Sequence, residues 1–321
     1  MATSGTRTLT RTRDDIIIGA LRLLGLYKPG GTAPHREIFD FAADSLNDMI
    51  TEWQADGVGQ WLKANATLYM QYGTSEYNIG PSGDHCTLSA IETTLSADGS
   101  AGESTITVDS ITGISDNDYI GIELDNNYFQ FTTVNGTPSG STITLDDVLT
   151  DNVNDGDFVF AYTNKVSRPL DIEDVRYVQD DDTEIQINSV SRNEYMAISD
   201  KSDTGTPNIV HYQPTMTNGK LYVWQPPDDV ELRLRFTIMQ PIEVFTSRTD
   251  NPCFPQEWFN TLKYNLADYM GLEYMTQIDN FGRLDARRYL LIQEKAREYR
   301  DKMFGNDTAR SPVQFVAAFW D

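Results

Sequence analysis

The stretch Ser104-Thr-Ile-Thr-Val-Asp109 returns 37 residues later as Ser141-Thr-Ile-Thr-Leu-Asp146. A second pair of related stretches, Asp116–Ile120 and Asp155–Val159, follows at an offset of 39 residues. Each copy alternates β-branched or aromatic residues with polar ones around an Asp-rich turn, which is typical of short strands. Two copies are too few for a solenoid, so the repeat predicts a small β-barrel with pseudo-two-fold symmetry over residues 88–165.

The repeat lies in the most acidic part of the chain. Residues 84–164 contain 14 Asp or Glu and no Lys or Arg, and the whole chain of 321 residues has a formal charge of −23. This field disfavours net affinity for nucleic-acid phosphates or anionic membranes. The turn over 151–156 resembles the start of an EF-hand, but Val153 and Tyr162 stand where calcium needs oxygen ligands. We therefore predict solvated β-turns and no metal site.

On either side of the repeat the sequence predicts further β structure. Residues 66–80 alternate around Gly73-Thr74-Ser75, which predicts a β-hairpin. Residues 166–245 predict a second β region that closes in a meander with a short helix before it. The strands expected there are 171–178, 183–190, 209–213, 220–224 and 230–239.

Both ends of the chain predict helices. A capping box at Thr12–Asp15 opens the first helix and Gly25 ends it. A second helix runs to Gly57, a third spans 255–274, and a fourth starts near Asn280. Their apolar stripes predict one shared helical core, because isolated amphipathic helices need a partner. The core residues expected are Leu21, Leu24, Met49, Trp53, Trp258, Leu262 and Leu266.

The predicted fold is therefore α+β: a helical bundle built from both chain ends, an inserted small β-barrel module and a second β meander region. The expected divisions are a helical body (1–66 and 246–304), a β-hairpin linker (67–87), the acidic repeat module (88–165), the second β region (166–245) and a C-terminal tail (305–321). The tail carries four large apolar residues beyond Pro312, which either pack on the chain itself or dock on a neighbour. These are Phe315, Val316, Phe319 and Trp320.

The chain offers few residues for catalysis. Its three histidines are His35, His85 and His211, and its two cysteines are Cys86 and Cys253. A nucleophile elbow, a P-loop and a zinc-binding HExxH are absent from the sequence. We therefore expect no catalytic residues, no cofactor and no enzyme. The low cysteine count, the missing apolar leader and the lack of a membrane-length apolar run predict a soluble protein made in a reducing cytoplasm.

Several stretches together resemble the head-to-tail adaptor proteins of short-tailed bacteriophages, also called packaged-DNA-stabilisation or tail accessory proteins and related to the tail tubular A proteins. The resemblance lies in Ile18–Gly25, Leu46–Gly57 and Phe254–Ala267, with Leu221–Asp228 similar to a strand and turn of longer members. It implies a structural virion protein at the head–tail junction, made in the host cytoplasm. The implied assembly is a homo-oligomeric, dodecameric ring.

The same resemblance implies the partners. The ring would dock on the portal protein, extend the DNA channel, retain packaged DNA and form a platform for a tail nozzle or tail fibre protein. Double-stranded DNA would pass without specific binding, and no membrane is involved. The four apolar tail residues would be the portal-docking peptide. The chain departs from the shortest members by about 180 extra β residues, 67–245, so the tail partner stays open.

Two alternatives remain at the level of sequence. One is a virion-associated glycan-binding or cell-wall hydrolase protein, which would need exposed aromatic side chains gathered on one face of the acidic module. The candidates are Tyr119, Tyr128, Phe129, Phe131, Phe158, Phe160 and Tyr162. The other is a monomeric chaperone or scaffold, which would form no ring.

Overall fold

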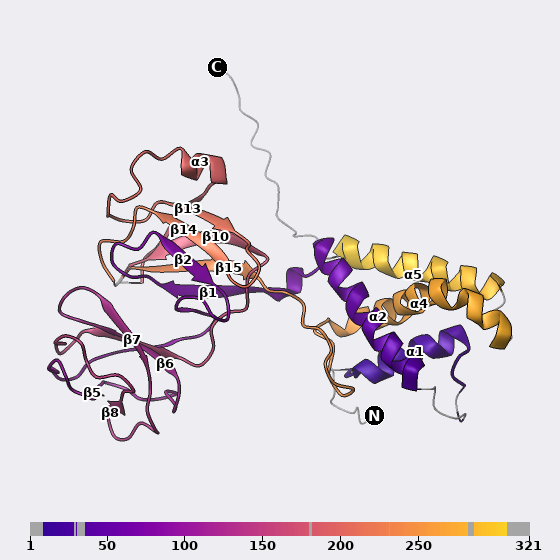
Figure 1. Cartoon of the computed structure of the whole chain (residues 1–321), viewed down its shortest axis with the longest axis horizontal. Coiled ribbons are helices and arrows are strands. Elements are labelled where there is room, and N and C mark those ends of the chain that lie inside the picture. The colour runs from indigo at the N-terminus through magenta and orange to yellow at the C-terminus, as the bar shows by residue number, and fades with distance from the viewer. Residues whose placement is uncertain are drawn as a thin grey trace, which may run out of the picture. The chain divides into compact units, whose positions relative to one another are not determined.

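A computed structural model of the chain describes residues 9–28, 30, 36–179, 182–230, 232–281 and 286–306. The chain divides into two compact units (Figure 1). One takes residues from both ends of the chain, 1–61 and 242–321, and we call it the helical unit. The other spans 62–241, and we call it the β unit. The predicted α+β class is confirmed, since helices and largely antiparallel sheets coexist.

The helical unit contains α1 (Arg13–Leu24), α2 (Arg36–Ala55), α4 (Phe259–Phe281) and α5 (Ala286–Asn306), with the 3-10 turn η2 (Gln256–Trp258) before α4. Another 3-10 turn, η1 (Gln60–Leu62), leads out of this unit. α1 starts as its sequence predicts: the Thr12 side chain accepts from the amide of Asp15, and the Asp15 carboxylate accepts from the amide of Thr12. It ends at Gly25 with φ 77°, a left-handed conformation that suits glycine.

α4 is the centre of the helical unit and packs against α1, α2 and α5. Two contacts explain the close packing of α4 on α5. The buried Asn265 side chain donates to the carbonyl oxygens of Thr261 at 2.9 Å and of Ala296, on α5, at 3.1 Å. Gly271 leaves room for the ring of Tyr289, which a Cβ at this position would strike.

The larger part of the β unit is a sandwich of two sheets. One has the order β11-β10-β15-β1-β3 and the other the order β12-β13-β14-β2. A short helix, α3 (Arg192–Met196), precedes β13, and apolar side chains from both sheets share one core. The strands are β1 (Lys63–Tyr69), β2 (Glu76–Ile79), β3 (Cys86–Thr87), β10 (Asp171–Val178), β11 (Glu184–Gln186), β12 (Asn188–Ser189), β13 (Ile209–Gln213), β14 (Gly219–Trp224) and β15 (Arg233–Met239).

The sandwich corrects two expectations. β1 and β2 do not form the predicted hairpin, because β1 pairs with β15 and β3 whereas β2 pairs with β14 in the opposite sheet. The predicted meander is also interrupted, since β14 pairs with β13 and β15 pairs with β10 and β1. Alternation of apolar and polar residues marks a strand with one buried face, but it is the same for either sheet of a sandwich.

The acidic repeat forms the remaining part of the β unit. β4 (Ile91–Thr94), β6 (Tyr119–Glu123), β7 (Phe129–Thr133) and β9 (Phe158–Tyr162) form a sheet with the order β4-β9-β6-β7. β5 (Thr105–Thr107) and β8 (Thr142–Thr144) form a separate ribbon, and the two share an aliphatic core. The predicted closed barrel is not formed: across 88–165, all of it described, the sheet and the ribbon are joined by the isolated bridges Leu95–Val108 and Val134–Leu145 and not by continuous ladders.

The pairing of the strands follows the repeat. Ile106 faces its repeat counterpart Ile143 in the ribbon, and Gly121 faces its counterpart Phe160 in the sheet. The ladder between β4 and β9 has the same register as the ladder between β7 and β6 once the offset of 39 is applied. The pseudo-two-fold symmetry predicted from the repeat is therefore present, although the architecture is a sheet and a ribbon joined by isolated bridges.

Candidate functional site at the junction of the repeat and the sandwich

One face of the sheet β4-β9-β6-β7 lies against the sandwich and is rich in aromatic side chains. Residues pointing to the other face, such as Ile120 and Val159, fill the core shared with the ribbon. The aromatic face contacts Tyr69 of β1, Tyr72 and Val230. Its members are Tyr119, Phe129, Phe131, Phe158, Phe160 and Tyr162. The alternation of each strand thus serves two cores, one inside the repeat and one at the junction.

The centre of the junction is a stack of two rings. Phe160 of β9 and Tyr69 of β1 are fully buried, and their planes are 8° apart. The position that is equivalent to Phe160 in the first copy is Gly121, which has no side chain. A Cβ there would collide with the Phe160 ring, so the glycine is required for the ring to lie over the pseudo-two-fold axis.

A charge network closes one end of the junction. The guanidinium of Arg233 on β15, whose side chain is 4 % exposed, donates to Glu92 at 2.7 Å and to Asp182 at 3.2 Å. It also donates to the carbonyl oxygen of Gln179 at 3.2 Å and lies 5.0 Å from the ring centroid of Phe158. The hydroxyl of Tyr69 donates to the second oxygen of Glu92 at 2.6 Å. Burial and the nearby Glu92 carboxylate raise the pKa of Tyr69, so this donor stays neutral.

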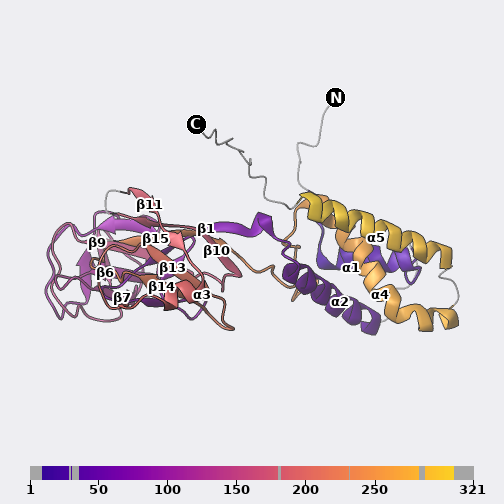
Figure 2. The same cartoon turned by 90° about the horizontal axis from the view of Figure 1, so that it is seen from above.

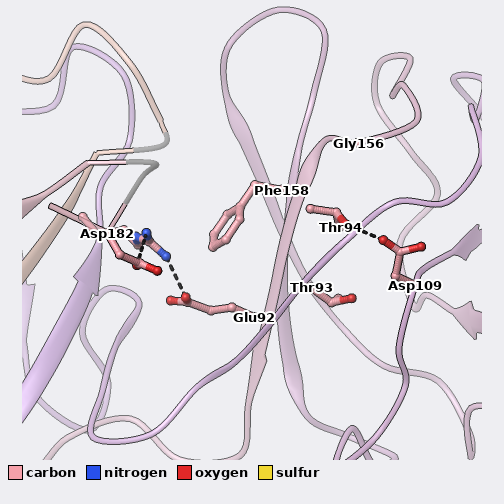
Figure 3. A pocket seen from close by; sticks show the side chains of 8 residues that line it. Glu92, Thr93, Thr94, Asp109, Gly156, Phe158 and Asp182 are labelled. Atoms are coloured by element: carbon pink, nitrogen blue, oxygen red, sulfur yellow. Dashed lines mark hydrogen bonds and ion pairs between the residues drawn. The ribbon is translucent and has the colours of Figure 1, made fainter.

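A cavity of about 490 Å³ opens beside this network (Figure 3). Figure 3 shows the pairings of its three carboxylates: Glu92 and Asp182 both bond to the Arg233 guanidinium, and Asp109 accepts from the hydroxyl of Thr94 at 2.7 Å. Every carboxylate of the lining has a partner within the protein. Such an arrangement favours a fixed joint between the repeat and the sandwich over acid–base chemistry, which needs a group free to exchange protons with a substrate.

The other end of the junction is built around His85. Its ring stacks on Phe131, with centroids 3.6 Å apart and planes 8° apart, and its Nδ1 shares a hydrogen bond of 2.8 Å with the Tyr162 hydroxyl. Burial, with a smaller effect of the Lys165 charge, lowers the pKa of His85 to about 3. His85 is thus a neutral packing residue at neutral pH. Its neighbour Cys86 points the opposite way, into the sandwich core.

The described part of the chain shows no arrangement typical of a metal or membrane site. No group of three or more His, Cys, Asp or Glu side chains in it is placed to hold a metal ion. Within the same residues, no helix is both long and apolar enough to cross a bilayer.

His211 bonds through Nδ1 to the carbonyl oxygen of Val190 at 3.0 Å and stacks on Tyr222.

Of the residues singled out in the sequence, the junction gathers six of the seven aromatic candidates for glycan binding, but none of the expected helical-core residues. Six of the expected helical-core residues are buried in the helical unit, and Trp258 is half-buried in η2. The four tail residues expected to dock on a portal lie outside the described residues. Arg233 and Glu92 were missed, whereas His85 was named in the sequence without being placed at a junction. The repeat contained one signal for Glu92. It occupies the position that is equivalent to Phe131 in the second copy, so a charged side chain replaces an aromatic one there.

Comparison with known proteins gives few matches. No family model matches the chain, and no curated protein matches it. Among solved structures, the Gp54 tailspike of Acinetobacter baumannii bacteriophage AP22 is 20 % identical over 25 % of this chain and 16 % of the tailspike, with a TM-score of 0.21. The chain thus covers a small part of that protein's length.

VP17, a capsid protein of bacteriophage P23-77, is 12 % identical over 59 % of this chain and 77 % of its own, with a TM-score of 0.12. In the VP16–VP17 complex of the same phage, the corresponding values are 11 %, 59 % and 80 %, with a TM-score of 0.11. TM-scores of this size do not establish a shared fold.

Proposed function

We propose that the protein is a non-enzymatic structural component of a bacteriophage virion, and that it acts as a subunit of a head-to-tail adaptor ring. One observation carries the proposal. The three helical stretches that resemble the adaptor family fold into α1, α2 and α4 and pack together in one helical unit, although the entire β unit separates the third stretch from the first two in sequence.

The distribution of charge supports a structural role along a DNA path. The β unit carries 9 Lys or Arg against 28 Asp or Glu, a net charge of −19. The helical unit carries 16 against 20, a net charge of −4. An acidic surface repels phosphates, so DNA can pass it without being held. In the proposal, the helical unit forms the ring on the portal, and the β unit faces a tail nozzle or tail fibre protein.

The glycan-binding alternative is disfavoured by the fate of the aromatic residues. It requires them to be exposed on one face of the repeat, whereas that face is packed on the sandwich. Tyr128 is the one of the seven that is more than a third exposed, at 43 %, and its ring lies 5.5 Å from that of Tyr72. The rings stabilise the junction and leave no stacking platform for a sugar.

Binding to the portal tests the proposal. We expect the full chain to bind rings of the portal protein encoded by the same genome, and a chain truncated after Asn306 to lose binding by on the order of 30-fold or more, since large apolar anchors each contribute about 2 kcal/mol. The double variant Phe319→Ser/Trp320→Ser should behave like the truncation. A variant with the exposed Met216 changed to Ser serves as the control for loss of an apolar side chain. Absence of binding by the full chain would contradict the adaptor role.

A further inference from the structure

The chain contains two Asn-Gly pairs, and they lie in different environments. Asn135 and Gly136 are both exposed in the loop that follows β7, which lies beside β6 at one end of its sheet (Figure 2). Asn218 and Gly219 lie where β14 begins, and Gly219 is buried. In an Asn-Gly pair the backbone nitrogen of the glycine can reach the carboxamide carbon of the asparagine, because glycine has no side chain to obstruct the approach.

The fold holds the second of these pairs in place. The carboxamide nitrogen of Asn218 donates to the Ser82 hydroxyl at 3.0 Å, and the carboxamide oxygen accepts from the Ser82 amide at 3.4 Å. Gly219 pairs with Ile79 in the ladder between β14 and β2, and a Cβ at Gly219 would collide with the hydroxyl of Tyr212. The side chain and the backbone of this pair are therefore fixed, which disfavours closure of a five-membered ring.

The side chain of Asn135 has no such restraint. Within the described residues no hydrogen bond joins it to another group, and only its backbone amide is bonded, to the carbonyl oxygen of Thr144 at 2.9 Å. Gly136 has φ 76° and open space where a Cβ would lie. Its amide donates to a carboxylate oxygen of Asp116 at 2.7 Å. The nitrogen of Gly136 thus lies next to a free carboxamide, and its hydrogen is already bonded to a base.

We propose that Asn135 deamidates in the folded chain and that Asp116 is the general base of this reaction. The Asp116 carboxylate takes the proton from the Gly136 nitrogen, and this nitrogen forms a bond to the side-chain carbonyl carbon of Asn135. The bond from that carbon to the side-chain nitrogen breaks, and ammonia leaves with the proton that Asp116 returns. Solvent water then opens the succinimide, so that Asp or isoaspartate replaces Asn135. A general base must lie within hydrogen-bond reach of the proton that it removes, and the contact of 2.7 Å meets this condition.

The first copy of the repeat cannot undergo the reaction. It has Ser96 and Ala97 at the equivalent turn, where the Ser96 amide donates to the carbonyl oxygen of Thr107 as the Asn135 amide donates to that of Thr144. A serine side chain has no carboxamide to be attacked. The turn therefore has the same backbone bonds in both copies, and the chemistry is confined to the second.

Deamidation changes the connection between the sheet and the ribbon. The bridge between Val134 and Leu145 links the two, and Asn135 is the next residue along the chain. Isoaspartate inserts a methylene carbon into the main chain at this point, so the bridge loses its register. Either product also carries a new carboxylate beside Asp116, in a stretch that has no Lys or Arg to pair with it. The reaction is a one-way change that weakens the attachment of the ribbon in one copy, and it does not depend on the adaptor role.

Peptide mapping by mass spectrometry of the full chain, incubated at mildly alkaline pH, tests the proposal. We expect Asp and isoaspartate to accumulate at position 135, while Asn218 stays unchanged over the same time. In the chain unfolded by urea both pairs should react at similar rates, because only the fold distinguishes them. Asp116→Asn keeps a hydrogen-bond acceptor but removes the base, so it should slow the conversion of Asn135 in the folded chain by on the order of tenfold or more.

The matched control is Asp155→Asn, which removes the equivalent exposed acid of the first copy and should leave the rate at Asn135 unchanged. Two results would overturn the site: no conversion at position 135 in the folded chain, or conversion at the same rate at Asn135 and Asn218 there. An unchanged or higher rate in Asp116→Asn contradicts the role of Asp116 as the base. Hydrogen exchange of the deamidated chain, separated by ion exchange, should be faster around Leu145 than in the unreacted chain, and equal exchange contradicts the weakened bridge.

Discussion

The two copies of the acidic repeat have the same internal bonds. The hydroxyl of Thr94 donates to Asp109 in the first copy, and Thr133 donates to Asp146 in the second. In the turns that follow, Asp118 accepts from the amide of Ser115 as Asp157 accepts from that of Asn154. What the copies share is therefore the set of side chains that shapes each turn and holds the ribbon to the sheet.

The copies differ on the face that meets the sandwich. The first has Glu92 and Gly121 where the second has Phe131 and Phe160. Each copy also receives a different cation: Arg233 lies 5.0 Å from the ring centroid of Phe158, and Lys165 lies 5.0 Å from that of the equivalent Tyr119. A symmetric module could dock in two ways, so divergence at the docking face selects one orientation. The repeated positions build the module, and the diverged positions attach it.

Removal of the ring on the pseudo-two-fold axis should have the largest effect. Phe160→Ala should destabilise the β unit by about 3–5 kcal/mol, because it removes a fully buried ring and leaves a cavity against Tyr69. Hydrogen exchange of the amides in β6 and β9 during denaturant titration measures the loss. The counterpart Gly121→Ala should cost about 1–3 kcal/mol, because the added methyl strikes the Phe160 ring. Equal and small losses at both positions would show that the axis is not the centre of the junction.

The next largest loss of stability is expected when the first copy is made to resemble the second at Glu92. Glu92→Phe leaves the buried Arg233 without its closest carboxylate and Tyr69 without its acceptor, so we expect a loss of about 2–4 kcal/mol in stability of the β unit. Adding Arg233→Leu to Glu92→Phe should recover part of this loss, because no unpaired buried charge remains and the Asp182 carboxylate is exposed to water. The double-mutant cycle measures the coupling between the two positions. Losses that simply add would contradict a coupled pair.

Local patterns predicted the elements well where one chemical feature decides the structure. The capping box at Thr12 and Asp15 and the left-handed Gly25 bound α1 as expected. The repeat predicted which residues would face each other, since Ile106 lies opposite Ile143. In each case the signal lies within a few residues or in an internal comparison, so no knowledge of the tertiary fold is needed.

The site could not be predicted in the same way. Arg233 follows the usual alternation of β15, and nothing near it in the sequence distinguishes it from Arg235 two residues later. The difference arises from the tertiary structure, which brings Glu92 over one arginine, while the other pairs with Glu184. The sheet to which β1 or β2 belongs was equally undecidable, because both sheets of a sandwich require the same pattern.

Acidification should test the second copy's side of the junction. His85 has a pKa of about 3 in the folded protein and an unfolded value near 6.5, so below pH 6.5 the unfolded state binds the proton and the folded state does not. Stability is therefore lost as pH falls, by about 1–2 kcal/mol between pH 7 and pH 5. His85→Phe keeps a ring against Phe131 and should remove this part of the pH dependence in denaturant titrations. If the stability of His85→Phe depends on pH as that of the unchanged chain does, the loss of stability at low pH comes from the carboxylates and not from His85.

The smallest effect concerns what the copies share. Thr94 and Thr133 are both half-buried, and each donates to an exposed aspartate, so Thr94→Val and Thr133→Val remove the same hydrogen bond at the same burial. We expect each to cost about 0.5–1 kcal/mol, and the two losses to agree within a few tenths and to add in the double variant, because the sites are separate. The matched control is Thr105→Val, whose side chain is exposed on the ribbon. A clear inequality between Thr94 and Thr133 would mean that divergence extends from the docking face into the turns, so that the two copies contribute differently to the module itself.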